Sequence, residues 1–67
     1  MKEKIKRLRE QKHMSQSDLA RAIGVSRACV NNWEQGQGDP SRALLLPLAQ
    51  VLGTTTDYLL DDHAPAA

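Results

Sequence analysis

Two serines, each placed just before a short helical segment, constrain the fold of this chain most strongly. Ser15 and Ser26 can each accept a hydrogen bond from the first turn of a following helix, and Asp18 completes a capping box with Ser15. A helix is expected over residues 16–23, the second of the chain, and should stop at Gly24, which tolerates the left-handed conformation that ends a helix. The third helix of the chain should follow Ser26 and run for about nine residues. The stretch therefore predicts two short helices that meet across a tight turn.

The segments around this pair also have helical spacing. Residues 2–12 are amphipathic, with Ile5 and Leu8 on one side. Charged residues, Lys4 among them, surround the rest of that helix. At the other end of the chain, residues 54–60 begin with three threonines that can cap a final turn or two.

Residues 41–52 form the most apolar helix of the chain. Pro47 lies inside this segment and lacks the N–H that a helix interior requires, so we expect the helix either to begin late or to bend. Because helical patterns fill the chain and no alternating strand pattern occurs, the fold class is expected to be all-α, with five short helices. The apolar stripe that should form the centre of the core comprises Leu44, Leu45, Leu48, Ala49 and Leu52.

The size of the chain limits it to one small domain. Its 67 residues bury only a modest part of the unfolded surface, so a partner subunit would help stability. Cys29 is the only cysteine, which excludes an internal disulfide and fits a cytoplasmic location. No stretch approaches the roughly 20 apolar residues of a membrane span. We expect a domain over residues 1–62 and a flexible tail over 63–67, which either ends the protein or begins a linker.

The sequence offers no metal, cofactor or catalytic site. His13 and His63 are far apart, and no cluster of cysteines or acidic residues has ligand spacing. Neither histidine belongs to a motif that would activate a serine, so we expect no enzymatic activity.

Charge is distributed unevenly along the chain, although its net value is only +1. Residues 1–42 carry all nine Lys and Arg against five acidic residues, whereas residues 43–67 carry three acidic residues and no Lys or Arg. The basic part could face a polyanion. Charge alone favours the simpler interpretation, in which the first helix has a solvated charged face.

The third helix carries an unusual polar stripe. Val30 and Trp33 are three residues apart and should share the face that packs into the core. Arginine can pair with guanine, asparagine with adenine, and an alanine methyl can contact the methyl group of thymine. The stripe that would offer these groups on one exposed face comprises Arg27, Ala28, Asn31, Asn32 and Gln35.

Four motifs in order give the chain a family resemblance. These are "SQSDLARAIGVS", the W-E-x-G of residues 33–36, the Pro-Ser of residues 40–41 and the ending D-Y-L-L. Over about residues 3–60 the chain resembles the Cro and phage-repressor type of helix-turn-helix, often called the Xre family. The resemblance implies a lambda-repressor-like DNA-binding domain, with the helix-turn-helix in its second and third helices.

The resemblance also implies roles for individual residues. Base contacts would come from Arg27, Ala28 and Asn32. An ion pair between Arg9 and Glu34 would orient Arg9 towards phosphate. The loop after the third helix has Gly38 and Asp39 where many relatives have basic residues, which departs from the family pattern. Contacts to the DNA backbone would come from Arg9, Gln16, Ser26, Asn31, Gln35, Gln37 and Arg42, and dimer contacts from Thr55, Thr56 and Tyr58.

These features predict a sequence-specific DNA-binding transcriptional regulator. It would act as a phage or bacterial repressor that binds a pseudo-palindromic double-stranded operator as a homodimer. The alternative is a protein-interaction module of the same fold, such as the antitoxin half of a toxin–antitoxin pair. A salt titration separates the two, because a protein that neutralises phosphates loses affinity as salt rises.

Overall fold

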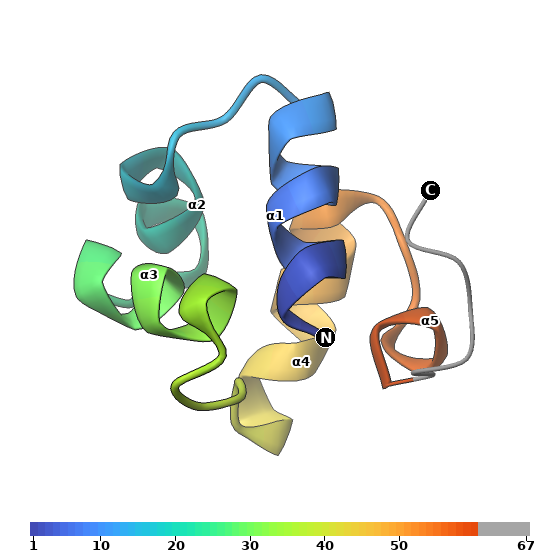
Figure 1. Cartoon of the computed structure of the whole chain (residues 1–67). Helices are drawn as coiled ribbons and strands as arrows, with labels where there is room; N and C mark the ends of the chain where they lie inside the picture. The colour runs from blue at the N-terminus through green and yellow to red at the C-terminus, as the bar shows by residue number, and fades with distance from the viewer. Residues whose placement is uncertain (61–67) are drawn as a thin grey trace.

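The computed structural model describes residues 1–60, which form five α-helices and no strand. The predicted tail 63–67 and the last two residues of the predicted domain 1–62 lie outside the described residues. None of the described helices is long and apolar enough to cross a membrane. The fold class is therefore confirmed as all-α (Figure 1). The helices are α1 (Lys2–Gln11), α2 (Gln16–Ile23), α3 (Arg27–Gln35), α4 (Arg42–Leu52) and α5 (Thr56–Leu60).

The predicted caps are confirmed at both helices of the central pair. Ser15 Oγ accepts a hydrogen bond from the Asp18 N–H at 3.0 Å, and the Asp18 carboxylate accepts one from the Ser15 N–H at 3.0 Å. Ser26 Oγ accepts from the Cys29 N–H at 3.2 Å. Gly24 ends α2 with a φ of 81°, in the left-handed region. These local bonds determine where α2 and α3 begin and how the chain turns between them.

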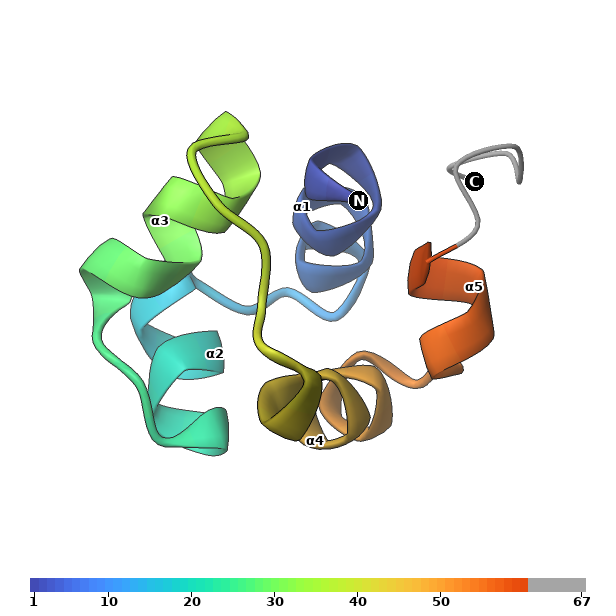
Figure 2. The same ribbon diagram turned by 90° about the horizontal axis from the view of Figure 1, so that it is seen from below.

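The core forms between the central pair, α1 and α4, and Leu59 of α5 completes it from the other side. Trp33 of α3 belongs to it and is 6% exposed. Two views show α1 lying over α4, with α2 and α3 on one side of them and α5 on the other (Figures 1 and 2). α5 and α3 therefore lie on opposite sides of the molecule. The largest fully buried side chains are Ile5, Leu19, Val30, Leu48, Leu52 and Leu59.

Helix α4 accommodates its proline without a late start. It begins at Arg42, directly after Ser41, and continues through Pro47 to Leu52. Of the two expected alternatives, a late start or a bend, the late start is therefore wrong. Leu45 before the proline and Leu48 after it are both buried, so packing on each side outweighs the lost hydrogen bond.

The structure places Lys4 of α1 differently from the prediction. We expected it among the solvated charges, but it is buried, with 4% of its surface exposed. Its Nζ donates to the Tyr58 carbonyl oxygen at 2.8 Å and lies 4.7 Å from the centroid of the Tyr58 ring. The long aliphatic stem allows the ammonium to reach across to α5.

Candidate nucleic-acid interface

Helix α3 turns a polar stripe to solvent, opposite its core face. Val30 and Trp33 are buried, as predicted. Asn31 was predicted to share the exposed stripe but is half-buried, so this part of the prediction is wrong. The remaining side chains of the stripe are exposed as expected: Arg27, Ala28, Asn32 and Gln35.

The turn between α2 and α3 fixes how α3 is presented. The N–H groups of Gly24 and Val25 both donate to the Ala20 carbonyl oxygen at 2.9 Å. These bonds supply donors at the C-terminal end of α2, where carbonyl oxygens would otherwise lack them. Ala20 is 3% exposed, and its small side chain allows the two helices to approach closely. The pair is thus a helix-turn-helix with α3 at the surface (Figure 1).

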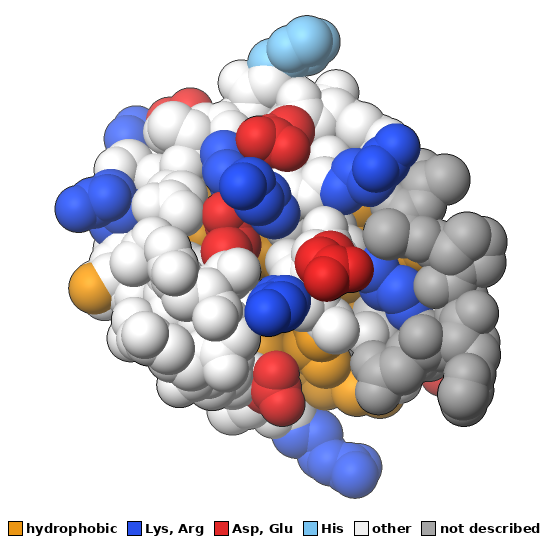
Figure 3. Space-filling model, viewed as in Figure 1, with side chains coloured by type: hydrophobic (Ala, Val, Ile, Leu, Met, Phe, Trp, Pro, Cys, Tyr) orange, Lys and Arg blue, Asp and Glu red, His pale blue; other side chains and the backbone are white. Residues whose placement is uncertain are grey.

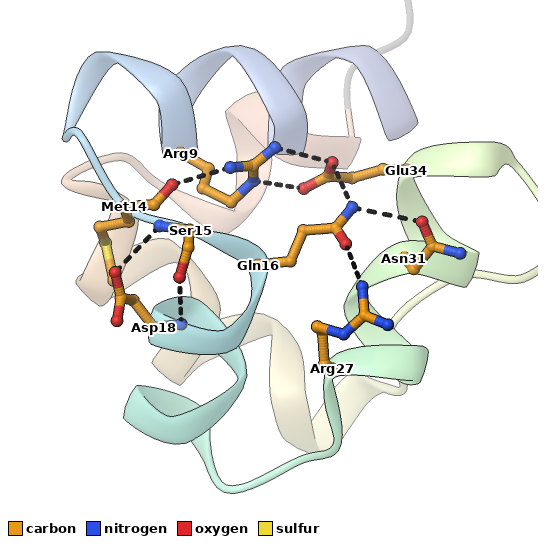
Figure 4. A network of polar contacts seen from close by, with 8 residues as sticks. All are labelled: Arg9, Met14, Ser15, Gln16, Asp18, Arg27, Asn31 and Glu34. Atoms are coloured by element: carbon orange, nitrogen blue, oxygen red, sulfur yellow. Dashed lines mark hydrogen bonds and ion pairs between the residues drawn. The ribbon is translucent and has the colours of Figure 1, made fainter.

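A polar network joins α2 to α3 through Gln16. Its Nε2 donates to Asn31 Oδ1 at 3.3 Å and to Glu34 Oε1 at 3.1 Å. Its Oε1 accepts from Arg27 Nη1 at 3.5 Å, the long limit of a hydrogen bond. Figure 4 shows the Gln16 amide between Glu34 on one side and Arg27 on the other. The network explains why Asn31 is half-buried and places the Arg27 guanidinium at the start of α3.

The predicted ion pair between Arg9 and Glu34 is confirmed and anchors α1 to this network. Arg9 Nε donates to Glu34 Oε2 at 2.7 Å, and Nη2 donates to Oε1 at 3.1 Å. The two side chains are only 12% and 5% exposed. A third bond runs from Arg9 Nη1 to the Met14 carbonyl oxygen at 2.7 Å. The hydrogen bond to Glu34 raises the pKa of Arg9. The charged guanidinium bridges Glu34 and the Met14 carbonyl oxygen, which fixes the α1–α2 connector.

The N-terminus of α2 offers donors that an anion could use. In an α-helix the N–H groups of the first turn have no intrahelical acceptor. The capping box uses the N–H of Asp18, which leaves the N–H groups of Gln16 and Ser17 directed out of the helix. Hydrogen bonds from the Ser15 backbone and side chain lower the pKa of Asp18, so its carboxylate is ionised in the same turn.

The other predicted backbone-contact residues lie in two places. Ser26, Gln35 and Gln37 are exposed around α3 and the loop after it. Arg42 is exposed at the start of α4, where it lines an open groove of about 550 Å³ between α4 and α5. The structure therefore brings Arg42 to the groove and not to the stripe on α3.

The predicted dimer residues are distributed around α5. Thr55 is exposed, and its Oγ1 accepts from the Tyr58 N–H at 3.1 Å, which confirms that a threonine caps this helix. Tyr58 is half-buried beside Lys4, and of the three predicted residues only Thr56 lines the groove. The groove is formed by Pro40, Arg42, Leu45, Leu46, Thr56 and Leu60.

The groove residue Leu46 was not singled out from the sequence, whereas Leu60 is one of the leucines beside Tyr58 that were expected at the dimer contact. Leu46 and Leu60 are the large apolar side chains that the described chain leaves most exposed, at 59% and 53%. Leu46 lies in a run of three leucines but outside the apolar stripe predicted to be buried. This position in the sequence was the signal that could have identified Leu46 as an exposed leucine.

Charge is mixed on the face that Figure 3 shows. Basic and acidic side chains alternate over α1, while the surface over α3 is mostly uncharged. Among residues 1–60, no three His, Cys, Asp or Glu side chains come together as a possible metal site.

The fold and the exposed stripe together define a helix-turn-helix domain with α3 as its surface helix. The chain belongs to the helix-turn-helix family HTH_3, whose model matches residues 5–59. The resemblance to the Cro and phage-repressor type is thereby confirmed.

Individual relatives agree with this assignment. The chain is 33% identical over 60 residues to the repressor protein C2 of Salmonella phage P22, covering 90% of this chain. It is 36% identical over 58 residues, 87% of the chain, to the transcriptional activator BcrR of Enterococcus faecalis. The chain spans 28% of the length of each of these two relatives.

Two solved structures have the same architecture. The P22 c2 repressor in complex with a synthetic operator matches with a TM-score of 0.87 and 32% identity, covering 90% of this chain and 91% of that one. SinR, a master regulator of biofilm formation, in complex with DNA matches with a TM-score of 0.81 and 32% identity, covering 91% of this chain and 100% of that one.

Proposed function

We propose that this chain is the sequence-specific DNA-binding domain of a transcription regulator. The exposed stripe on α3 carries the proposal, because it offers side chains suited to base edges on a helix supported from behind by α2. In the major groove Arg27 would pair with guanine and Asn32 with adenine, while the Ala28 methyl would contact thymine. The P22 c2 and SinR structures, both solved with DNA, support this use of the fold.

Backbone contacts would surround this stripe. The N–H groups at the start of α2 point outward and would bind a phosphate, with the helix dipole assisting. Gln16 and Asn31 would help mainly by orienting their neighbours, because they hydrogen-bond each other. Arg9 would act through the small exposed part of its guanidinium. The exposed residues proposed for direct phosphate contact are Ser26, Gln35 and Gln37.

We further propose that two copies associate through the groove between α4 and α5. Leu46 and Leu60 would be covered by the partner copy, with Thr56 beside them and Arg42 at the rim. The molecule measures 28 × 23 × 20 Å. Two copies side by side could therefore place their α3 helices about 34 Å apart, the spacing of half-sites one DNA turn apart. Repression would follow from occupying a promoter.

Selection of bound duplexes from a random DNA pool tests whether the exposed stripe on α3 contacts specific bases. We expect a two-fold-related motif. Asn32→Ala and Arg27→Ala should each relax one position of the half-site, at a loss of about 1–3 kcal/mol. Gln50→Ala is the matched control, because Gln50 is an exposed polar residue on α4. Equal losses on every sequence would contradict base reading and indicate backbone contact only.

A salt titration of the selected duplex separates this function from the protein-interaction alternative. Arg27 is the one cation of the exposed α3 stripe, so each domain should neutralise few phosphates. The slope of log affinity against log salt should be about −1 to −3 per domain. A selection that yields no motif leaves no duplex to titrate and would instead favour a protein partner.

A further inference from the structure

Lys4 is a buried cation that joins the first helix to the last. Only 4% of the residue is exposed, and its Nζ donates to the Tyr58 carbonyl oxygen at 2.8 Å. The same ammonium lies over the Tyr58 ring, 4.7 Å from its centroid. A buried ammonium is costly unless polar partners replace water. Both contacts are made with α5, on the side of α1 away from α3 (Figure 2).

Helix α5 needs such an anchor. It has five residues, which is far below the length at which an isolated helix is stable. The Tyr58 carbonyl belongs to its last turn, where carbonyl oxygens lack intrahelical donors and a cation is favoured by the helix dipole. Leu59 is completely buried and holds α5 by packing. Lys4 adds a directional bond to the same turn.

Two exposed lysines, Lys2 of α1 and Lys12 just after it, have side chains near the glycines that end two other helices. A Cβ built on Gly53, which ends α4, would lie 3.0 Å from Lys12 Nζ. A Cβ built on Gly36, which ends α3, would lie 3.4 Å from Lys2 Nζ. Within the described residues 1–60, neither of these exposed lysines has a hydrogen bond to a helix carbonyl like that of Lys4. Burial together with a direct bond to the Tyr58 carbonyl oxygen therefore distinguishes Lys4 from the other two.

The position of α5 determines one wall of the groove. Thr56 and Leu60 line it, and Tyr58 lies between them in the sequence. We infer that Lys4 is a positioning residue for self-association, because it holds α5 where Thr56 and Leu60 can meet a second copy. Lys4 itself is buried and faces neither the partner nor the stripe on α3. This inference rests on the proposed dimer and adds the internal residue on which its contact surface depends.

Three variants on α1 test the inference. Lys4→Met removes the charge, Lys4→Arg retains a cation, and Lys6→Met is the control at an exposed position of the same helix. Affinity is measured for selected duplexes that carry one half-site or two. Lys4→Met should keep the affinity for one half-site within about twofold and lose about fivefold or more of the cooperative gain on two. Lys4→Arg should restore most of that gain, and Lys6→Met should resemble the parent protein.

Amide hydrogen exchange provides a readout that needs no DNA. In Lys4→Met the Leu59 N–H, which donates to the Thr55 carbonyl oxygen at 3.3 Å, should exchange about tenfold faster, while amides of α2 and α3 keep their rates. This local change would show that Lys4 holds α5 even if no DNA motif were selected, so failure of the anchoring can be told apart from failure of the proposed function. Unchanged exchange in α5, unchanged cooperativity, or unfolding of the whole chain in Lys4→Met would each overturn the inference.

Discussion

Replacing Arg9 by methionine should destabilise the domain more than any other single charge removal on α1. The substitution leaves the Glu34 carboxylate, 5% exposed, with the Gln16 amide at 3.1 Å in place of a bidentate guanidinium. Removing one partner of a buried ion pair costs about 3–5 kcal/mol. We expect about 3 kcal/mol, the low end, because Gln16 still donates to Glu34. A domain of this size has a free energy of unfolding of only about 3–10 kcal/mol.

Thermal unfolding followed by the emission of Trp33, the only tryptophan and a core residue, measures this loss. At this domain size 1 kcal/mol lowers the midpoint by about 4–8 °C, so Arg9→Met should melt about 12–24 °C below the parent protein. Arg7→Met, at an exposed position of the same helix, is the control and should change stability by no more than about 0.5 kcal/mol.

The double variant Arg9→Met/Glu34→Met decides whether burial is the cause. With both charges gone, no ion is left desolvated, and the free energy of unfolding should return to within about 1 kcal/mol of the parent value. The reasoning is refuted if Arg9→Met costs less than about 1 kcal/mol, as an exposed pair would. It is also refuted if the double variant is as unstable as the sum of the two single ones.

Three further substitutions test local features of the fold. His13 has a φ of 56° and gains nothing from its Cβ there, so His13→Gly should stabilise the domain by about 0.5–1 kcal/mol, measured by thermal unfolding. Pro47→Ala should restore a hydrogen bond within α4 and raise stability by about 1–2 kcal/mol; a lower melting temperature would show that the ring's packing matters more. The lowered pKa of Asp18 means that its stabilising contribution is complete above its ordinary value of 3.8 and declines as pH falls through its folded value. The stability difference between the parent protein and Asp18→Asn, from unfolding curves at neutral and acidic pH, should therefore shrink on acidification; a constant difference would contradict this assignment.

Local rules predicted the features that depend on a few neighbouring residues. The capping box of Ser15 and Asp18 and the stop at Gly24 could be predicted because each forms within one turn of the chain. The core face of α3 followed from the spacing of Val30 and Trp33. The pair of Arg9 with Glu34 spans 25 residues and came from family resemblance, since no local spacing reports it.

The errors occurred where another helix decides a residue's surroundings. Periodicity places Asn31 on the exposed stripe of α3, but Gln16 of α2 covers it. Amphipathic spacing places Lys4 on the solvated side of α1, but α5 returns to that side and buries it. The groove could not be predicted for the same reason, because Leu46 and Leu60 come together only through the arrangement of α4 and α5. Such features depend on the tertiary arrangement, which periodicity along one helix does not contain.

The use of charge within the fold bears on how this domain would bind DNA. Part of the basic surplus of the sequence is used within the protein itself: Arg9 pairs with Glu34, and the buried ammonium of Lys4 donates to the Tyr58 carbonyl oxygen. The exposed stripe on α3 carries one cation, Arg27, among neutral side chains. Sequence-independent attraction to phosphates should therefore be weak, because it scales with the charges neutralised. A larger share of the binding free energy would then come from base contacts, so a net charge of +1 favours selective over general DNA binding.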